Sequence, residues 1–275
     1  MSQSPTTQNR IDVRLTQIRA QNRPALVTFT MAGDPDRATA QTILNGLPAA
    51  GADIIELGMP FSDPMADGPA IQAAAQRALA GNMTLAQTLA MVASFRAHDT
   101  HTPVVLMGYY NPVYIYGPER FIIEAIKAGI DGLIIVDLPP EEEAELGDHA
   151  RVHGLNMIRL VTPTTDDARL GKILPGAGGF IYYVSITGIT GAASANIEAL
   201  APRLTHLKTQ TDLPIAIGFG IRTPHDAAAM GAVGDCVVVG SAIVENIGKI
   251  PDGKKTIDEI FAQVKELAAA LAKKP

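Results

Sequence analysis

In the stretch GLIIVDLPPEEEAELGDHARVH, residues 132–153, an apolar run is followed by two prolines and three glutamates. Residues 132–137 are almost continuously apolar, which is typical of a strand buried on both faces of a parallel sheet. Pro140 and the glutamates after it indicate a helix start, because proline fits the first helical turn and acidic side chains favour the helix dipole there. We therefore predict a strand, a short loop and a helix over residues 140–153.

The same unit recurs along the chain. The other apolar runs are residues 25–31, 53–57, 103–107, 156–161, 180–185, 214–218 and 236–240. Apolar residues at helical spacing predict helices over residues 36–50, 84–98 and 256–272. Eight strand–helix units in 275 residues favour a (β/α)8 TIM barrel over an open doubly wound α/β sheet. An amphipathic segment from Ile11 to Ile18 predicts an extra N-terminal helix before the barrel.

The composition indicates one folded domain. Hydrophobic residues make up 47% of the chain, which is enough for a sizeable core. No linker or shift in composition divides the sequence, so we predict a single domain over residues 1–275. Residues 1–10 are polar and are expected to form a frayed tail.

Charge, cysteine content and hydropathy narrow the class of protein. The formal net charge of −6 argues against nucleic-acid binding, which needs a basic surface. Cys236 is the only cysteine, so an intramolecular disulfide is ruled out and a reducing compartment fits. The first ten residues do not resemble a secretory leader, and no apolar run approaches the ~20 residues of a membrane span. We expect a cytoplasmic protein that binds neither nucleic acid nor membranes.

Three carboxylates lie in ELGMPFSDPMADGP, residues 56–69, where the second strand ends. Loops after the strands form the active face of a TIM barrel, so this stretch is a candidate site. Glu56 shares a strand face with Ile54 and would have a raised pKa if that face points inward; an exposed strand-end glutamate is the alternative. Asp63 and Asp67 could face one substrate, or could simply form turns.

Other strand ends carry further candidates. Phe29 and Tyr182 either belong to the core or point into the barrel mouth, and Asp137 either acts in catalysis or caps a turn. Glycine-rich stretches follow the last three strands, at residues 188–192, 217–221 and 238–244. Glycines let backbone N–H groups approach an anion, and barrels often bind phosphate at this corner. A phosphate site with Gly240 and Ser241 at a helix start is therefore predicted, with tight turns as the alternative.

The positions of histidine and lysine limit the chemistry. All six histidines fall on predicted helices, at helix starts or in the loop before the third strand, and none of the nine lysines ends a strand. A metal-dependent epimerase would need histidines at the barrel mouth, and a Schiff-base aldolase would need a lysine there. We therefore expect acid/base chemistry by carboxylates on a phosphorylated small molecule, with no metal.

Seven motifs together resemble the tryptophan synthase alpha chain family. They are IELGMPFSDPMADGPAIQ (55–72), FTMAGDP (29–35), MGYYNP (107–112), VDLPPEE (136–142), YYVSITGITG (182–191), GFGI (218–221) and VGSAIV (239–244). The resemblance extends over roughly residues 24–245, and the first motif is the most specific. It implies that the chain cleaves indole-3-glycerol phosphate to indole and glyceraldehyde 3-phosphate in a retro-aldol reaction.

The resemblance also implies roles for individual residues. Glu56 corresponds to the catalytic general acid/base, and Asp67 to the aspartate that binds the indole N–H. Pro60 and Asp63 correspond to the loop that communicates with the partner subunit, and Thr190 to a lid loop that pairs with Asp67. The remaining positions correspond to substrate-binding residues, namely Phe29, Tyr182, Gly191, Gly218, Phe219, Gly220, Gly240 and Ser241.

A partner follows from the same resemblance. The family implies an α2β2 tetramer in which indole passes to a beta chain that makes L-tryptophan. The pyridoxal phosphate would belong to that beta chain, and no cofactor is expected in this one. A stand-alone lyase that releases free indole, and a catalytically idle barrel that only activates a beta chain, are the alternatives. Intact Glu56, Asp67 and Tyr182 argue against the idle barrel.

Overall fold

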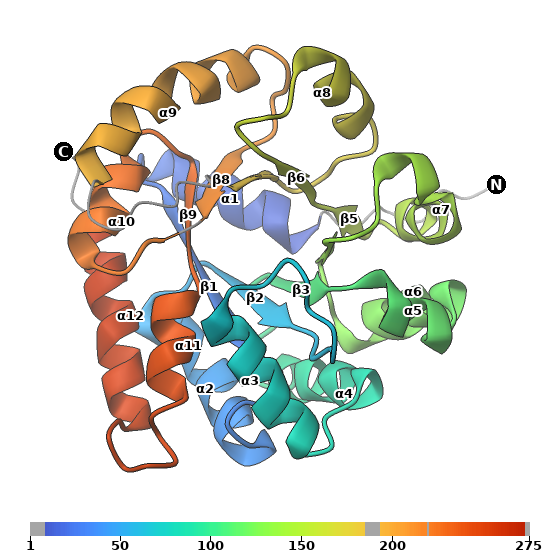
Figure 1. Cartoon of the computed structure of the whole chain (residues 1–275), viewed down its shortest axis with the longest axis vertical. Helices are drawn as coiled ribbons and strands as arrows, with labels where there is room; N and C mark the ends of the chain where they lie inside the picture. The colour runs from blue at the N-terminus through green and yellow to red at the C-terminus, as the bar shows by residue number, and fades with distance from the viewer. Residues whose placement is uncertain (1–8, 185–192, 219, 273–275) are drawn as a thin grey trace.

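The computed structural model describes residues 9–184, 193–218 and 220–272, with the backbone alone described for residues 193–199. Within this part of the chain, parallel strands form one ring and helices surround it (Figure 1). The strands are β1 (Ala25–Met31), β2 (Ile54–Gly58), β3 (Val104–Gly108), β4 (Gly132–Ile135), β5 (Asn156–Met157), β6 (Arg159–Val161), β7 (Ile181–Val184), β8 (Ile215–Gly218) and β9 (Cys236–Val239).

The nine strands make an eight-stranded barrel. Their order is β5-β4-β3-β2-β1-β9-β8-β7-β6, and every pairing is parallel. The two end strands of this order, β5 and β6, are consecutive in the chain and are separated only by Ile158. The Ile158 N–H donates to the carbonyl of Leu133 in β4, at 2.9 Å, so the strand continues through the break. The ring is therefore closed, which confirms the predicted (β/α)8 TIM barrel.

Helices follow the strands as the sequence predicted. They are α1 (Arg10–Ala20), α2 (Arg37–Ala50), α3 (Pro69–Ala80), α4 (Leu85–Arg96), α5 (Tyr110–Tyr116), α6 (Pro118–Ala128), the 3-10 turn η1 (Pro140–Glu142), α7 (Ala144–Val152), α8 (Asp167–Ile173), α9 (Ala193–Lys208), α10 (Pro224–Gly231), α11 (Ser241–Ile247) and α12 (Ile257–Ala272). The predicted helix over 140–153 is divided at Glu143. The Glu143 side chain turns inward there and forms a buried ion pair with Arg159 of β6.

Alternate residues of each strand fill the barrel interior. Side chains along a strand point to opposite faces, so one set meets the surrounding helices and the other set meets at the axis. The inward set is Ala25, Val27, Ile54, Val105, Ile134, Ile158, Phe180, Ala216, Cys236 and Val238. The α1 helix adds Ile11, Leu15 and Ile18 to the same cluster. The extra N-terminal helix thus closes one end of the barrel, and Figure 1 shows it within the ring of strands.

Two aspartates fix α1 at the end of the barrel where the strands begin. Asp53 precedes β2 and binds Arg14 and Arg23, each at 2.7 Å. Asp131 precedes β4 and binds Arg10 at 2.8 Å. Each carboxylate also accepts a backbone N–H of the neighbouring strand, so helix and barrel share the same buried charges. Arg10 and its neighbour Asn9, which donates to the Asp131 carbonyl at 2.8 Å, are held in place although the sequence assigned both residues to the tail.

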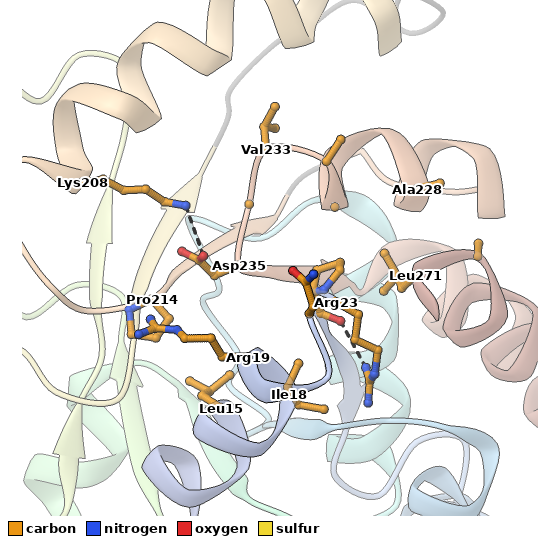
Figure 2. A pocket seen from close by; sticks show the side chains of 16 residues that line it. Leu15, Ile18, Arg19, Arg23, Lys208, Pro214, Ala228, Val233, Asp235 and Leu271 are labelled. Carbon is orange, nitrogen blue, oxygen red and sulfur yellow. Dashed lines mark hydrogen bonds and ion pairs between the residues drawn. The ribbon is translucent and has the colours of Figure 1, made fainter. Parts of the chain in front are cut away.

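A hollow of about 470 Å3 lies at the same end of the barrel (Figure 2). The last residues of α1, α10 and α12 line it, with apolar side chains such as Leu15 and Leu271. Lys208 binds Asp235 across its edge, at 3.1 Å. Because these helices end there, their carbonyl dipoles favour the nearby cations. The hollow lies where α1 packs against the outer helices, away from the loops that follow the strands.

Within the described residues, no single helix has the length and apolar character needed to cross a membrane. Only α3 and α4 taken together meet that requirement, and a bend of 96° separates them.

Candidate active site

Glu56 lies at the inner edge of the barrel mouth. It is two residues after Ile54, which belongs to the interior cluster, so its side chain points inward near the end of β2. Phe29 of β1 is its direct neighbour in the sheet, and Val105 of β3 lies on the other side. The apolar strands that the sequence showed on each side thus place a carboxylic acid among hydrophobic side chains.

Burial changes the acidity of Glu56. The residue is 1% exposed, and neither of its carboxyl oxygens has a hydrogen-bond partner among the described residues. Loss of solvent raises the pKa of Glu56 to about 8, and the charge of Asp67 contributes in the same direction. Glu56 is therefore protonated at neutral pH and can donate a proton. Of the two alternatives from the sequence, the inward-facing one is observed and the exposed strand-end glutamate is not.

Asp67 lies in the loop between β2 and α3 and is half-buried. Burial raises the pKa of Asp67 to about 6, while a hydrogen bond from the Tyr109 hydroxyl lowers it. The pKa of Asp67 is thus below that of Glu56, although above the usual value for aspartate. The charge of Asp67 raises the pKa of Glu56, so the two carboxyl groups lie near one another.

Asp63 does not join the two carboxylates. It is exposed and accepts a hydrogen bond from the Ser62 hydroxyl at 2.6 Å. Pro60 lies nearer the start of the same loop and is partly exposed. The loop therefore has one end, with Asp67, at the mouth and a middle part at the surface.

Two aromatic side chains at the mouth, Tyr182 and Phe29, each lie against a glycine of the neighbouring strand. Tyr182 of β7 packs against the barrel interior, and burial together with the charge of Glu56 raises the pKa of Tyr182 well above its usual value. A Cβ on Gly218 of β8 would lie 2.7 Å from two ring carbons of Tyr182. A Cβ on Gly58 of β2 would lie 2.6 Å from the ring tip of Phe29. The absence of side chains at these two glycines leaves room for the aromatic rings.

The glycine-rich corner lies after β8 and β9. Gly220 has a φ of +73°, which favours glycine, and nothing lies within 4 Å of the position its Cβ would take. Gly240 caps α11, and Ser241 is the exposed first residue of that helix, as predicted. β8 and β9 are paired, so the two turns are neighbours. Thr190, Gly191 and Phe219, which the sequence also proposed, lie outside the described residues.

Two residues near the mouth differ from the sequence-based view. The Asp137 carboxylate accepts the backbone N–H of Tyr110, the first residue of α5, at 2.8 Å, so it binds the start of that helix and not the turn before Pro139. Tyr109, directly after β3, is 3% exposed and interacts with the loop that carries Asp67. The sequence analysis assigned it no role. An aromatic residue at a strand's carboxyl end was the signal available.

The arrangement suits proton transfer to and from an organic substrate. A neutral acid with a pKa of about 8 and a carboxylate with a pKa of about 6 share one apolar mouth. Pairs of groups whose surroundings separate their pKa values in this way are typical of acid/base sites. Among the described residues, no group of three histidine, cysteine or acidic side chains is placed to hold a metal ion.

Comparison with known proteins gives the family. The model of the tryptophan synthase alpha chain family matches residues 15–272. The crystal structure of a tryptophan synthase alpha chain from Legionella pneumophila subsp. pneumophila is similar, with 38% identity, a TM-score of 0.89, and coverage of 96% of this chain and 98% of that one. The subunit alpha of L. pneumophila strain Paris has 39% identity and a TM-score of 0.90, over 96% and 99% of the two chains.

A more distant relative agrees with these. A chain in a structure of Mycobacterium tuberculosis tryptophan synthase has 34% identity and a TM-score of 0.87, over 97% of this chain and 99% of that one. The match to the family model and the similarity to these structures both extend over nearly the whole barrel, including β2, the loop after it, and the glycine-rich turns after β8 and β9. This chain therefore belongs to the tryptophan synthase alpha chain family.

Proposed function

We propose that this alpha chain cleaves indole-3-glycerol phosphate with Glu56 as general acid/base and Asp67 as the carboxylate that stabilises the indole N–H. The family performs this retro-aldol reaction, which gives indole and glyceraldehyde 3-phosphate. The observation that carries the assignment is a buried glutamic acid at the barrel mouth, Glu56, whose carboxyl oxygens have no hydrogen-bond partner among the described residues, with a second carboxyl group, Asp67, near it.

The proposed steps need only one proton donor. Neutral Glu56 protonates the ring carbon that bears the side chain, and the positive charge that develops on the ring nitrogen is stabilised by ionised Asp67. The Glu56 carboxylate then takes the proton of the neighbouring side-chain hydroxyl. The O–H electrons form the aldehyde C=O, the C–C bond breaks, and its electrons restore the indole ring. Glu56 ends the cycle protonated, so atoms and charge balance.

The surrounding residues would bind the rest of the substrate. Phe29 offers an apolar face for the indole ring and Tyr182 lies on the same wall as Gly218. The phosphate is proposed to bind at the glycine-rich corner, where Gly220 and Ser241 are exposed. Backbone N–H groups would supply donors there without a lysine or arginine. Thr190, Gly191 and Phe219, together with Gly240, complete the proposed substrate-binding set.

A beta chain is proposed to bind over the same face of the barrel, in an α2β2 tetramer. The family implies such a partner. Large apolar side chains are exposed on the segments after β2 and β3, namely Met65, Tyr114 and Ile115. Exposed apolar groups gathered on one face favour a protein–protein contact. Pro60 and Asp63 lie in the first of these segments and are proposed to transmit signals between the subunits.

The proposal also covers the cofactor and the cellular location. Pyridoxal phosphate would be held by the beta chain, which converts indole to L-tryptophan, and this chain would hold no cofactor. A cytoplasmic location fits Cys236, which is free and buried. A stand-alone lyase that releases indole is the second candidate, and the response to a beta chain distinguishes the two.

The experiment measures indole release from indole-3-glycerol phosphate by wild type and by Glu56→Gln, each with and without a tryptophan synthase beta chain. The amide keeps the size of the side chain and cannot donate the proton, so we expect a loss of at least about a hundredfold in rate with substrate binding retained. Glu119→Gln, an exposed change in α6, is the matched control and should cleave normally. Equal rates for Glu56→Gln and wild type would disprove the role of Glu56. Cleavage that no beta chain stimulates would favour the stand-alone lyase.

A further inference from the structure

Tyr109 occupies a junction between β3 and the loop that carries Asp67. It is the residue immediately after β3 and caps the start of α5. Its side chain is almost fully buried although it lies at the barrel mouth. A buried phenol needs a partner for its hydroxyl, and here the hydrogen-bond partner comes from the loop after β2.

The hydroxyl of Tyr109 interacts with two consecutive residues of that loop. Its oxygen accepts the backbone N–H of Ala66 at 3.0 Å. The hydroxyl also lies near the carboxylate of Asp67 and lowers the pKa of that carboxyl group. The ring of Tyr109 also packs against Phe61 near the start of the same loop, with ring centroids 5.4 Å apart. One side chain therefore contacts the beginning and the end of the loop.

The loop has other anchors, but none of them acts on the Asp67 carboxylate. The backbone N–H of Asp67 donates to the Pro64 carbonyl at 3.1 Å, and the Gln72 side chain donates to the Asp67 carbonyl at 2.8 Å. Both bonds fix the main chain. The Tyr109 hydroxyl, by contrast, acts on the carboxylate itself and lowers its pKa.

We propose that Tyr109 is a positioning residue for the cleavage reaction, which aims the Asp67 carboxylate at the indole N–H by holding the loop through its bond to the Ala66 backbone and its ring contact with Phe61. This inference rests on the proposed function of Asp67. Tyr109 does not touch the reacting atoms; it acts through Asp67. A hydrogen bond that accompanies the ionised form of a carboxyl group also favours that form.

Several titratable groups lie around Tyr109 and Asp67. Glu56 from β2 and Tyr109 from the end of β3 face Asp67. Asp137, after β4, lies near Tyr109, and Tyr182 of β7 lies near Glu56. Burial, together with the charges of Asp67 and Asp137, raises the pKa of Tyr109 to about 12, so its hydroxyl keeps its proton at neutral pH.

The test compares wild type with Tyr109→Phe, which removes the hydroxyl and keeps the ring that packs on Phe61. Tyr116→Phe is the matched control, because it also removes a tyrosine hydroxyl, one bonded to Glu124 on α6. Thermal unfolding shows that each variant is folded. Two readouts follow: the pH profile of kcat and KM, and the titration of the Asp67 carboxyl carbon by 13C NMR in the substrate-free chain.

We expect Tyr109→Phe to raise the pKa of Asp67 by about one unit. The acidic limb of the kcat profile then moves to higher pH by the same amount, and the rate below pH 6 falls roughly tenfold. KM should change less than kcat, because Asp67 is proposed to interact most strongly with the charge that develops during reaction. Tyr116→Phe should leave both readouts unchanged.

The proposal is overturned if folded Tyr109→Phe has the same Asp67 titration and the same acidic limb of the kcat profile as wild type. A graded second variant, 3-fluorotyrosine at position 109, keeps the hydroxyl and makes it a stronger donor, so the pKa of Asp67 should fall below the wild-type value; a rise would also overturn the proposal. The NMR readout needs no activity. If wild type fails to cleave indole-3-glycerol phosphate while Tyr109→Phe still shifts the Asp67 titration, the proposed function fails and the link between Tyr109 and Asp67 stands.

Discussion

The phenol ring of Tyr182 lies against the main chain of Gly218, so closely that a Cβ at residue 218 would stand 2.7 Å from Cε1 and Cζ of the ring. The two residues are on neighbouring strands, β7 and β8, and both face the barrel interior. The position of the tyrosine at the mouth therefore depends on a glycine in the next strand.

Gly218→Ala should displace Tyr182 and impair cleavage. The added methyl group cannot fit without movement of the ring, and overpacking of this kind costs about 1–3 kcal/mol of stability. We expect kcat/KM to fall by roughly tenfold or more, because a small displacement of a positioning group is costly in catalysis. Gly171→Ala is the control: nothing lies within 4 Å of its Cβ position in α8, and the change should stabilise the helix by about 0.5–1 kcal/mol. Full activity in Gly218→Ala would contradict the expectation.

Glu56→Gln should change how stability depends on pH. The folded chain raises the pKa of Glu56 from 4.5 to about 8, so its favourable contribution is complete below about pH 4.5 and is lost as pH rises towards 8. The amide does not titrate. Relative to wild type, the variant should gain unfolding free energy across this window, by at most about 1.4 kcal/mol per pH unit. Urea unfolding at pH 5.5, 6.5 and 7.5 measures the difference. Parallel pH curves would show that Glu56 has an ordinary pKa.

Asp131→Asn should loosen the closed end of the barrel. The change leaves Arg10 and the buried Arg96 without a carboxylate, and breaking a buried ion pair costs about 3 kcal/mol. The midpoint of urea unfolding should fall accordingly. Asp148→Asn breaks an exposed pair with Arg151 and should change stability by less than about 0.5 kcal/mol. Equal effects for the two variants would show that Asp131 does not anchor α1.

Ile115→Asp should weaken binding of the beta chain. Ile115 is 77% exposed on α5, which directly follows β3 on the proposed docking face, so a charge there would have to be desolvated on binding. Val152→Asp introduces the same charge at an equally exposed position at the far end of α7, and should bind normally. Titration calorimetry with a beta chain gives both affinities, and we expect at least about a tenfold loss for Ile115→Asp alone. Equal affinities would place the partner on another face.

Strand positions were predictable because each strand is buried on both sides. Continuous apolar runs marked all eight, with ends correct to within about two residues. Helices were less regular. The break at Glu143 depends on Arg159, which lies in a different strand and is far away in the sequence. A local pattern predicts an element, but a contact between distant residues decides where the element is interrupted.

The sequence by itself determined the barrel, the family and the identity of the candidate carboxylates, because apolar periodicity and the order of the motifs are local properties. Tertiary structure alone decided that Glu56 points inward among apolar side chains, and that Asp137 binds the backbone N–H of Tyr110 at the start of α5. It also brought Tyr109 to Asp67 and Gly218 beneath Tyr182. Acidity and alignment depend on burial and on charges brought close through space. Those distances arise only when the strands close into a ring.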